Sequence, residues 1–319
     1  MLLTFPSANY QPGVRDFGNG CFAYLQPDGG WGLSNAGLVT SDGEALLIDT
    51  LFDVPHTRAM LDAFARASDA KISTVFNTHQ NGDHWFGNEL VEGAEIVATE
   101  RATEAMAQES PERLAGFMQA APQLGLTGEY LVHCFGRYAF NGIHAKVPNT
   151  TFTGHLSKQV GSKRVELVEV GPAHTGGDAI AYVEADRTVF TGDILFIDGT
   201  PVVWAGPVGN WIAACEMIEE LDADTIVPGH GPVTDKRGVA RVREYLTYIR
   251  DEARKRRDAG LGAFEAARSI ALDDYAGWGD SERIAVNVAT LYREFGDTNT
   301  PSDAATLFGW MAQLWKDRT

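Results

Sequence analysis

The amino-acid sequence predicts a mixed α/β (α+β) protein. We expect a main domain over residues 1–235 with a helical insertion at about 100–145, and a helical C-terminal extension over 236–319 packed on it. Short apolar or alternating runs, typical of strands, recur in two blocks, one on each side of the insertion. Apolar residues at helical spacing dominate the insertion and the extension. Several strand-like runs end in polar, glycine-bearing turns, which is where sheet proteins commonly place functional side chains.

Short strands and turns alternate in the first block. Cys21–Leu25 and Ala45–Asp49 are short apolar runs that predict strands, and Ser41–Glu44 predicts the hairpin turn before the second one. Residues 55–67 carry apolar side chains near helical spacing and predict an amphipathic helix. The apolar run Ile72–Phe76 predicts a buried strand.

The insertion has two parts with different composition. Residues 101–121 are rich in Ala, Glu and Met and predict a helix, whereas residues 125–142 are aromatic and irregular. Such a segment either roofs a site or is an ordinary surface excursion, and the sequence leaves both interpretations open.

The second block and the extension complete the expected elements. Arg164–Val170 alternates polar and apolar residues, as a half-buried strand does. Further strands are expected at 179–183, 188–191 and 225–227, and a helix at 211–221. Helices of the extension are expected at 239–257, 262–271, 281–295 and 301–316. These helices either cap a site or form a subunit interface, so an oligomer is one open alternative.

Composition limits the partners. The chain has 319 residues, 44% of them hydrophobic, which is enough for a large core. Its net charge is −17, and an acidic surface repels phosphate backbones, so we expect no nucleic-acid partner.

Cysteine usage and the N-terminus predict a location. Cys21, Cys134 and Cys215 are odd in number and far apart, which fits buried thiols better than disulfides or a thiolate metal site. Residues 1–13 lack a basic segment followed by an apolar core, and no apolar run is long enough to span a bilayer. We expect a cytoplasmic protein with no membrane partner.

The segment Asn77–His84 is the most informative feature of the chain. It follows the strand Ile72–Phe76 directly and places His79, Asp83 and His84 within a few residues. Imidazole nitrogen and carboxylate oxygen are ligands of divalent transition metals. The segment therefore predicts a metal site at the end of a strand.

Three later strand ends offer the same kind of side chain. His174, Asp193 and His230 each follow a predicted strand, in turns that contain glycine. A single His or Asp after a strand is more often structural than functional. Four such strand ends in one chain are hard to obtain by accident, so together they favour one metal centre.

This ordered set resembles the metallo-β-lactamase superfamily, whose pattern is His-x-His-x-Asp-His, then a His, an Asp and a final His. The resemblance runs from about Gly18 to Pro232. It implies a four-layer αβ/βα sandwich with metals at one edge between two sheets. By this likeness His79, Asn81 and His174 form a first metal site, Asp83, His84 and His230 a second, and Asp193 bridges them.

Asn81 departs from the family pattern, which has His at this position. A neutral amide oxygen binds a borderline metal less well than imidazole, so the first site is either weak, completed by water or absent. Alternatively, Asn81-Gly82 is simply a favoured turn dipeptide. We expect zinc, one or two ions, with iron or manganese as alternatives.

A metal with an open position polarises a carbonyl and makes hydroxide available near neutral pH. Asp83 is the catalytic candidate, because it can both ligate the metal and orient the hydroxide. The resemblance, together with the absence of a Gly-x-Ser-x-Gly motif, predicts a metal-dependent esterase, thioesterase or lactonase. The expected substrate is a small acyl molecule, free or carrier-bound.

Aromatic residues near the motif or in expected loops are candidates for substrate contact, although core packing explains any one of them as well. The candidates are Trp85, Phe86, Tyr138 and Trp204. His133, His144 and His155 are candidates for substrate contact or proton transfer, but a surface or structural role is the more common one for such histidines.

Other functions remain open on the same scaffold. An iron-dependent oxygenase or redox enzyme would use the same ligands. Hydrolysis of β-lactams is a further alternative. The third alternative is a non-catalytic binding protein that has lost one metal site. Asn81 is the only residue that supports this alternative.

Overall fold

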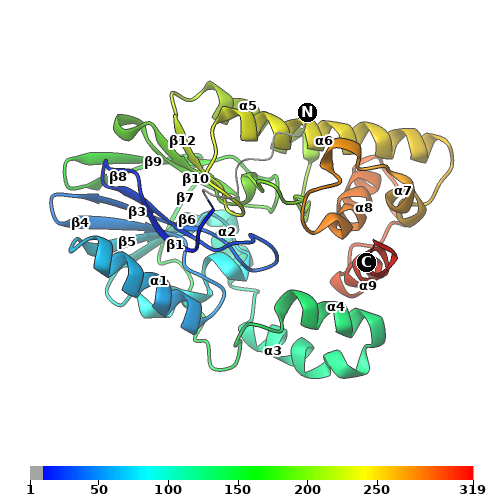
Figure 1. Cartoon of the computed structure of the whole chain (residues 1–319), viewed down its shortest axis with the longest axis horizontal. Coiled ribbons are helices and arrows are strands. Elements are labelled where there is room, and N and C mark those ends of the chain that lie inside the picture. The colour runs from blue at the N-terminus through cyan, green and yellow to red at the C-terminus, as the bar shows by residue number, and fades with distance from the viewer. Residues whose placement is uncertain (1–9, 319) are drawn as a thin grey trace.

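Two facing β-sheets form the centre of the protein, and helices cover both outer faces (Figure 1). The computed structural model describes residues 10–318. The first sheet has the order β1-β2-β3-β4-β5-β6-β7 and the second the order β12-β11-β10-β9-β8. The result is the four-layer αβ/βα sandwich that the family resemblance implied.

The strands of the first sheet are Gly13–Asp16 (β1), Cys21–Leu25 (β2), Ala36–Ser41 (β3), Glu44–Ile48 (β4), Lys71–Phe76 (β5), Glu95–Thr99 (β6) and Thr150–Phe152 (β7). Those of the second are His155–Val160 (β8), Lys163–Glu169 (β9), Ala179–Val183 (β10), Thr188–Phe190 (β11) and Thr225–Val227 (β12). The expected turn between β3 and β4 is confirmed: Asp42 and Gly43 both have positive φ, as a two-residue hairpin turn requires. No pattern had singled out β1, β6, β7 or β8.

The alternation of side chains along β4 explains how the layers are held together. Leu46 and Ile48 point between the two sheets and pack with Val165 and Leu167 of β9. Their neighbours Ala45 and Leu47 point outward, into the cluster that includes Met60 and Phe64 of helix α1. Both faces are apolar because both are covered.

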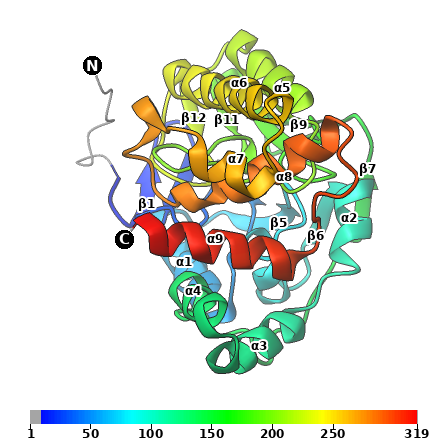
Figure 2. The ribbon, with the colours of Figure 1, turned by 90° about the vertical axis from the view of Figure 1, so that its right-hand side faces the viewer.

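The helices of the main domain are Val54–Ala67 (α1), Glu100–Met106 (α2), Pro111–Ala120 (α3), Gly125–Phe135 (α4) and Val208–Glu220 (α5). Those of the extension are Lys236–Asp258 (α6), Ala263–Ser269 (α7), Ile284–Glu294 (α8) and Ala304–Arg318 (α9). Figure 2 shows α9 crossing the extension, with α7 and α8 on one side and α3 and α4 on the other.

Two expectations for the insertion were wrong. The single helix expected over 101–121 is two helices, because Ser110 caps a new one at Pro111, which cannot continue the preceding helix. The segment 125–142, expected to be irregular, forms α4 over its first half. Its aromatic side chains pack on the extension, where the rings of Tyr130 and Trp315 lie 5.7 Å apart. Burial against the extension thus stabilises a helix whose local helix propensity is weak.

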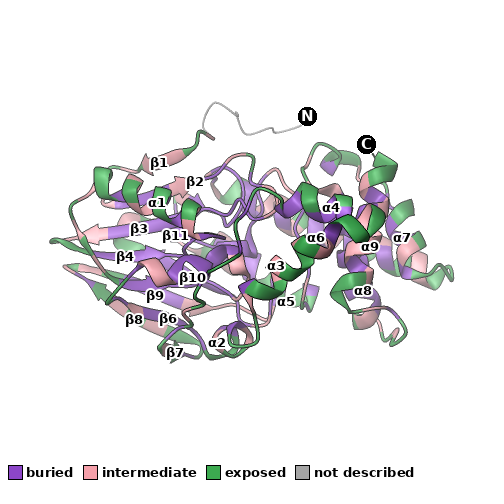
Figure 3. Ribbon diagram, turned by 90° about the horizontal axis from the view of Figure 1, so that it is seen from below, coloured by how far each residue is buried: buried purple, intermediate pink, exposed green. Residues whose placement is uncertain are grey.

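Burial is concentrated in the sheets and where the sheets meet the helical half of the molecule (Figure 3). A large cluster there joins side chains of the main domain, the insertion and the extension. No helix within residues 10–318 is long and apolar enough to cross a membrane.

Candidate metal centre

The predicted ligands meet at one edge of the sandwich, where strands of both sheets end. His79 and the short 3-10 helix Gly82–His84 follow β5, His174 follows β9, Asp193 follows β11 and His230 follows β12. All of these side chains are buried. The centre thus receives ligand-type groups from strands of both sheets, as the sequence predicted.

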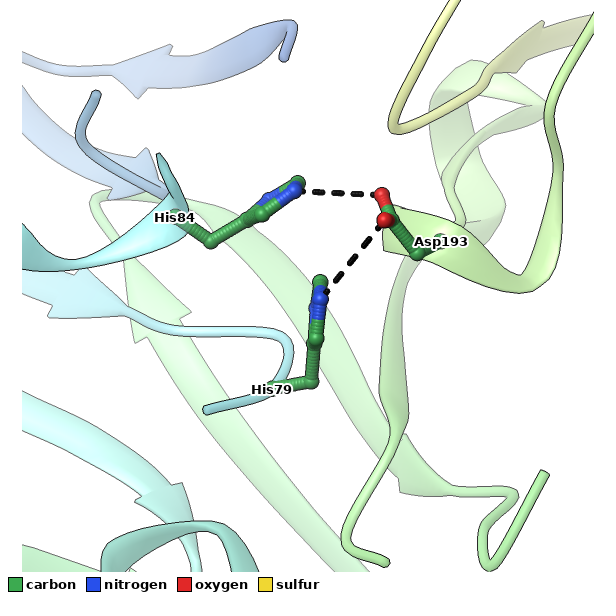
Figure 4. Close-up of side chains that lie close together, drawn as sticks. All are labelled: His79, His84 and Asp193. Carbon is green, nitrogen blue, oxygen red and sulfur yellow. Dashed lines mark ion pairs between the residues drawn. The ribbon is translucent and has the colours of Figure 1, made fainter. Parts of the chain in front are cut away.

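Asp193 lies at the middle of the centre (Figure 4). Its Oδ1 is 3.1 Å from Nε2 of His84, and its Oδ2 is 3.7 Å from Nε2 of His79. The same Oδ2 lies 3.3 Å from Nε2 of His174 and 3.4 Å from Nε2 of His230. One carboxylate therefore faces four imidazole nitrogens, as expected of a bridging ligand.

The donor atoms fall into two overlapping groups, each compact enough for one metal ion. His79, His84 and Asp193 form one, and Asp83, His84 and His230 form the other. Asp83 Oδ2 lies 3.4 Å from Nε2 of His230. The second group consists of the three residues that the family resemblance assigns to the second site. The first group differs from the implied first site, because it contains His79 and the implied bridge Asp193 but has His84 in place of Asn81 and His174.

Hydrogen bonds orient His84 and His79 from behind. His84 Nδ1 donates to Asp49 Oδ2 at 2.8 Å, and the Thr78 hydroxyl donates to the same oxygen at 2.8 Å. Because that hydroxyl proton is used, His79 Nδ1 at 3.0 Å must be the donor to Thr78 Oγ1. Asp49 thus determines, directly or through Thr78, the tautomer of two ligands.

Backbone carbonyls orient the other two imidazoles. His174 Nδ1 donates to the carbonyl of Val202 at 2.6 Å, and His230 Nδ1 donates to that of Gly29 at 3.0 Å. All four imidazoles therefore direct Nε2 toward the centre, where its lone pair can bind a metal once that nitrogen is deprotonated. This arrangement is the one that metal-ligating histidines require.

The residues fit a metal by a further test. Nε2 of His79, His84 and His174 and Oδ1 of Asp193 are buried and make no hydrogen bond to any residue within 10–318. Leaving a buried polar atom unpaired costs about 1–3 kcal/mol. Several such atoms converging on one point are explained by an ion that they can all bind.

Electrostatics in the metal-free centre reflect this crowding. Burial lowers the pKa of His84, but the carboxylates of Asp193, Asp49 and Asp83 outweigh it and raise that pKa well above its ordinary value. Burial also lowers the pKa of His230, but Asp193 outweighs burial and raises that pKa to about 9. Burial raises the pKa of Asp193, but the surrounding imidazoles bring it well below its ordinary value. The centre therefore combines positively charged imidazoles with negatively charged carboxylates, and a bound cation can take the place of the positive charges.

Asp49 is a functional residue that no sequence pattern singled out. It ends the predicted strand Ala45–Asp49, is almost fully buried, and adopts a positive φ of 61°, which Asp tolerates better than most residues. Its oxygens accept hydrogen bonds from both the amide and the hydroxyl of Thr78. The position of this carboxylate at the end of a buried strand was the sequence signal that could have identified Asp49.

Asn81 is not part of a left-handed turn. Its φ and ψ are −66° and 134° and Gly82 does not have positive φ. The carbonyl of Asn81 nevertheless accepts a hydrogen bond from the amide of His84 at 2.9 Å, so Asn81 is the first residue of a turn, a position that Asn favours, and the turn interpretation stays open. The side chain of Asn81 lines the same pocket as Asp83 and His174. Ligation by Asn81 remains a prediction.

We expect Asn81→His to strengthen metal binding at the first site by about tenfold, since imidazole is the better ligand for a borderline metal. Elemental analysis and titration with a chelating dye would measure the change. Gln80→His adds an imidazole one residue earlier and serves as the matched control. Equal metal content in Asn81→His and the parent protein would show that position 81 does not limit the site.

A cavity of about 730 Å³ opens from the metal centre. Its inner end carries Asp83, His174, Asp193 and His230. Its walls are mainly apolar and aromatic, from the main domain, the insertion and the extension; they include Trp31, Phe52, Phe86, Phe117, Phe135, Phe196, Trp204 and Phe308. The insertion and α9 therefore contribute walls to the cavity above the metal centre. A subunit interface formed by the extension stays a prediction.

Two of the four substrate-contact candidates line this cavity. Phe86 and Trp204 do, whereas Trp85 and Tyr138 are not among its described lining residues. Trp85 is 0% exposed and donates its indole N–H to the carbonyl of Gln80 at 2.8 Å. Tyr138 packs behind Phe52, with ring centroids 4.9 Å apart. Both rings therefore pack in the core beside the cavity, and substrate contact by either one stays a prediction.

The other histidines lie away from the cavity lining. His133 stacks on Trp315, with ring centroids 5.0 Å apart, and His155 pairs with Glu166 at 2.5 Å on the second sheet. His144 is exposed. The structural interpretation therefore holds for all three.

Comparison with known proteins identifies the family. Residues 29–230 match the model of the metallo-beta-lactamase superfamily, and the chain belongs to that superfamily. The linear primary-alkylsulfatase of Pseudomonas sp. (strain ATCC 19151) is 23% identical over 254 residues, covering 71% of this chain and 48% of the relative. The hydroxyacylglutathione hydrolase of Dictyostelium discoideum is 25% identical over 169 residues, covering 50% of this chain and 48% of the relative.

Solved structures show the same fold. The inverting sec-alkylsulfatase Pisa1 from Pseudomonas sp. has a TM-score of 0.67 at 16% identity, covering 93% of this chain and 52% of that one. A metallo-beta-lactamase from Pontibacter korlensis has a TM-score of 0.57 at 18% identity, covering 74% of this chain and 99% of that one. The chain spans about half the length, or less, of the curated relatives it matches.

Proposed function

We propose that the protein is a metal-dependent hydrolase that cleaves an ester, thioester or lactone of an apolar acyl group. The observation that carries this proposal is the direct opening of the metal centre into the apolar cavity of about 730 Å³. A cavity of this size and lining suits a drug-sized apolar ligand with one reactive polar group.

When bound, a divalent metal would lower the pKa of a coordinated water and polarise the scissile carbonyl. His79, His84, His174 and His230 would hold it with Asp193 between them. Asp83 faces both the centre and the cavity, so its carboxylate can orient the attacking water and accept its proton. The aromatic walls would exclude bulk water and align the acyl group.

The charges around the cavity favour a neutral substrate body. Arg113 at the exposed end is paired with Glu109 at 2.9 Å. Arg283 in the wall is paired with Asp280 at 2.7 Å. Neither guanidinium is left without a counter-charge, whereas apolar contacts are plentiful.

Activity assays test the proposal directly. The protein is incubated with p-nitrophenyl esters, acyl thioesters and lactones of graded chain length, before and after chelation and with zinc, iron or manganese added back. We expect hydrolysis of esters or thioesters, lost with chelator and restored by metal. Hydrolysis that ignores chelator, or no hydrolysis of any carbonyl substrate, would overturn it.

Sulfate-ester hydrolysis is a second candidate, favoured by the alkylsulfatase similarity, which covers 71% of the chain. An alkyl sulfate and an ester of equal chain length separate the two candidates. Faster release of sulfate would favour the second one. A chromogenic cephalosporin in the same assay tests the β-lactam alternative, and oxygen consumption by an iron-loaded sample tests the oxygenase alternative.

The exposed end of the cavity predicts chain-length selectivity. Ala304 and Ala305 at the start of α9 face this end, together with Phe117 and Leu124 of the insertion. Ala305→Trp should lower kcat/KM for a decanoyl ester by about tenfold, because displacing two methylenes from the cavity costs about 1.6 kcal/mol. An acetyl ester should be hydrolysed within about twofold of the parent rate, since it ends before the rim.

Ser302→Trp is the matched control, because Ser302 is exposed and is not among the described lining residues. It should leave both esters unaffected. Equal loss for acetyl and decanoyl esters in Ala305→Trp would mean that the rim does not contact the acyl tail.

A further inference from the structure

We propose that Arg283, a residue of the C-terminal extension, is a positioning residue for the metal ligand His230. The inference concerns the metal centre and does not depend on which bond the protein cleaves. Two separate chains of contact lead from the guanidinium of Arg283 to the imidazole of His230, one through Phe196 and one through Trp31.

Arg283 is held rigidly between two aromatic rings. Arg283 is 1% exposed. Its Cζ lies 4.2 Å from the ring centroid of Trp31 and 5.4 Å from that of Phe196. Nη2 pairs with Asp280 Oδ2 at 2.7 Å, and Nη1 donates to the carbonyl of Thr200 at 3.0 Å. These bonds hold the guanidinium so that it meets both rings.

The first route passes through Phe196. Its ring lies parallel to the imidazole of His230, at an interplanar angle of 2° and a centroid distance of 5.0 Å. The backbone supports the same contact, since the amide of Ile197 donates to the carbonyl of His230 at 3.0 Å. A guanidinium that supports Phe196 from its own side therefore limits the tilt of the imidazole.

The second route passes through the loop that contains Gly29 and Trp31. The Gly29 carbonyl accepts the Nδ1–H of His230 at 3.0 Å and so determines its tautomer. Gly29 has a φ of +82°, and a Cβ there would lie 2.7 Å from the amide nitrogen of Gly231, so this loop is closely fitted to the His230 turn. Trp31, two residues later, is fixed by Arg283 and by an indole hydrogen bond of 3.1 Å to Tyr130.

Both routes reach His230, which belongs to the group Asp83, His84 and His230, and not to the group His79, His84 and Asp193. Phe196 also lies 5.5 Å from the ring of His174, but at an interplanar angle of 59°, whereas its contact with His230 is a parallel stack. The extension should therefore tune the second metal position more than the first. Partners that orient a ligand typically change metal affinity by about 10–100-fold when removed.

Arg283→Met tests the proposal, because Met keeps the length and apolar contact of the side chain but lacks the charged plane. Zinc binding at each site, visible absorption of the cobalt-loaded protein, and the melting temperature of the metal-free protein are measured. We expect the second ion to bind about 10–100-fold more weakly, with the first within about threefold of the parent value. Arg283→Lys keeps the charge without the plane and should recover only part of the loss.

Arg241→Met is the matched control. Arg241 lies in the same extension and stacks on an aromatic ring, with Cζ 4.6 Å from the centroid of Tyr275, but that stack does not reach the metal centre. It should leave both affinities unchanged. If Arg283→Met does not fold, Phe196→Leu removes the ring of the first route while keeping Arg283, and the same selective loss is expected.

Two results would overturn the proposal. One is an unchanged affinity at the second site together with a lowered melting temperature, which would make Arg283 a purely structural residue. The other is an equal loss at both sites, which would mean that the extension supports the whole fold and does not act on His230 in particular.

Discussion

Asp193→Asn is expected to release bound metal and to lower kcat/KM by about 10³-fold or more. The carboxylate of Asp193 faces four imidazoles at 3.1–3.7 Å, so its replacement by a neutral amide removes the charge that holds them around a cation. Metal catalysis contributes several kilocalories per mole of transition-state stabilisation, which corresponds to that loss in rate. Metal content and ester hydrolysis, measured on the same sample, check both parts.

Asp198→Asn is the matched control for this substitution. Asp198 lies five residues later, is half-buried, and has a φ of 59°, a conformation that Asn also tolerates. It should keep its metal and its activity. Full metal occupancy in Asp193→Asn would show that this carboxylate is not a ligand.

Asp49→Asn is expected to weaken metal binding by about 10–100-fold and to destabilise the metal-free protein by about 1–3 kcal/mol. Asp49 accepts hydrogen bonds from the Thr78 amide, the Thr78 hydroxyl and His84 Nδ1. An asparagine has one acceptor and one donor group in place of two acceptors, so at least one of these donors loses its partner or His84 turns. Chemical denaturation and zinc titration measure the two effects separately.

Asp178→Asn distinguishes orientation of a ligand from simple burial of a carboxylate. Asp178 is also almost fully buried and accepts hydrogen bonds from Thr175 and from the amide of Ala173, and within residues 10–318 it accepts none from an imidazole. It should destabilise the fold to a similar extent but change metal affinity less. Equal metal loss in both variants would contradict a specific role for Asp49.

Local patterns predicted much of the fold and of the metal centre. The strand Cys21–Leu25 and the turn before β4 were found because apolar runs and turn residues are signals that span only a few neighbouring positions. The set His79, Asp83, His84, His174, Asp193 and His230 was found because each residue follows a recognisable strand. The local sequence Ser110-Pro111 also indicates the break between α2 and α3, but the high helix propensity of the surrounding residues obscured this signal.

The substrate side was predicted less well. Trp85 and Phe86 are adjacent in sequence, yet the former is buried in the core and the latter lines the cavity. Helix α4 forms because its apolar face packs on α9 of the extension, which begins more than 150 residues later in the chain. Proximity to a motif says nothing about the direction of a side chain, which depends on what packs against it.

The sequence by itself determined the order and chemistry of the candidate metal ligands, because each of these residues lies on a turn that its own short segment specifies. Only the tertiary structure decided what surrounds them. It brought Asp49 behind His84, roofed the centre with α4 and α9, and placed Arg283 in the stack that leads to His230. These contacts join segments far apart in the chain, and their geometry depends on the packing of whole layers, which no local pattern records.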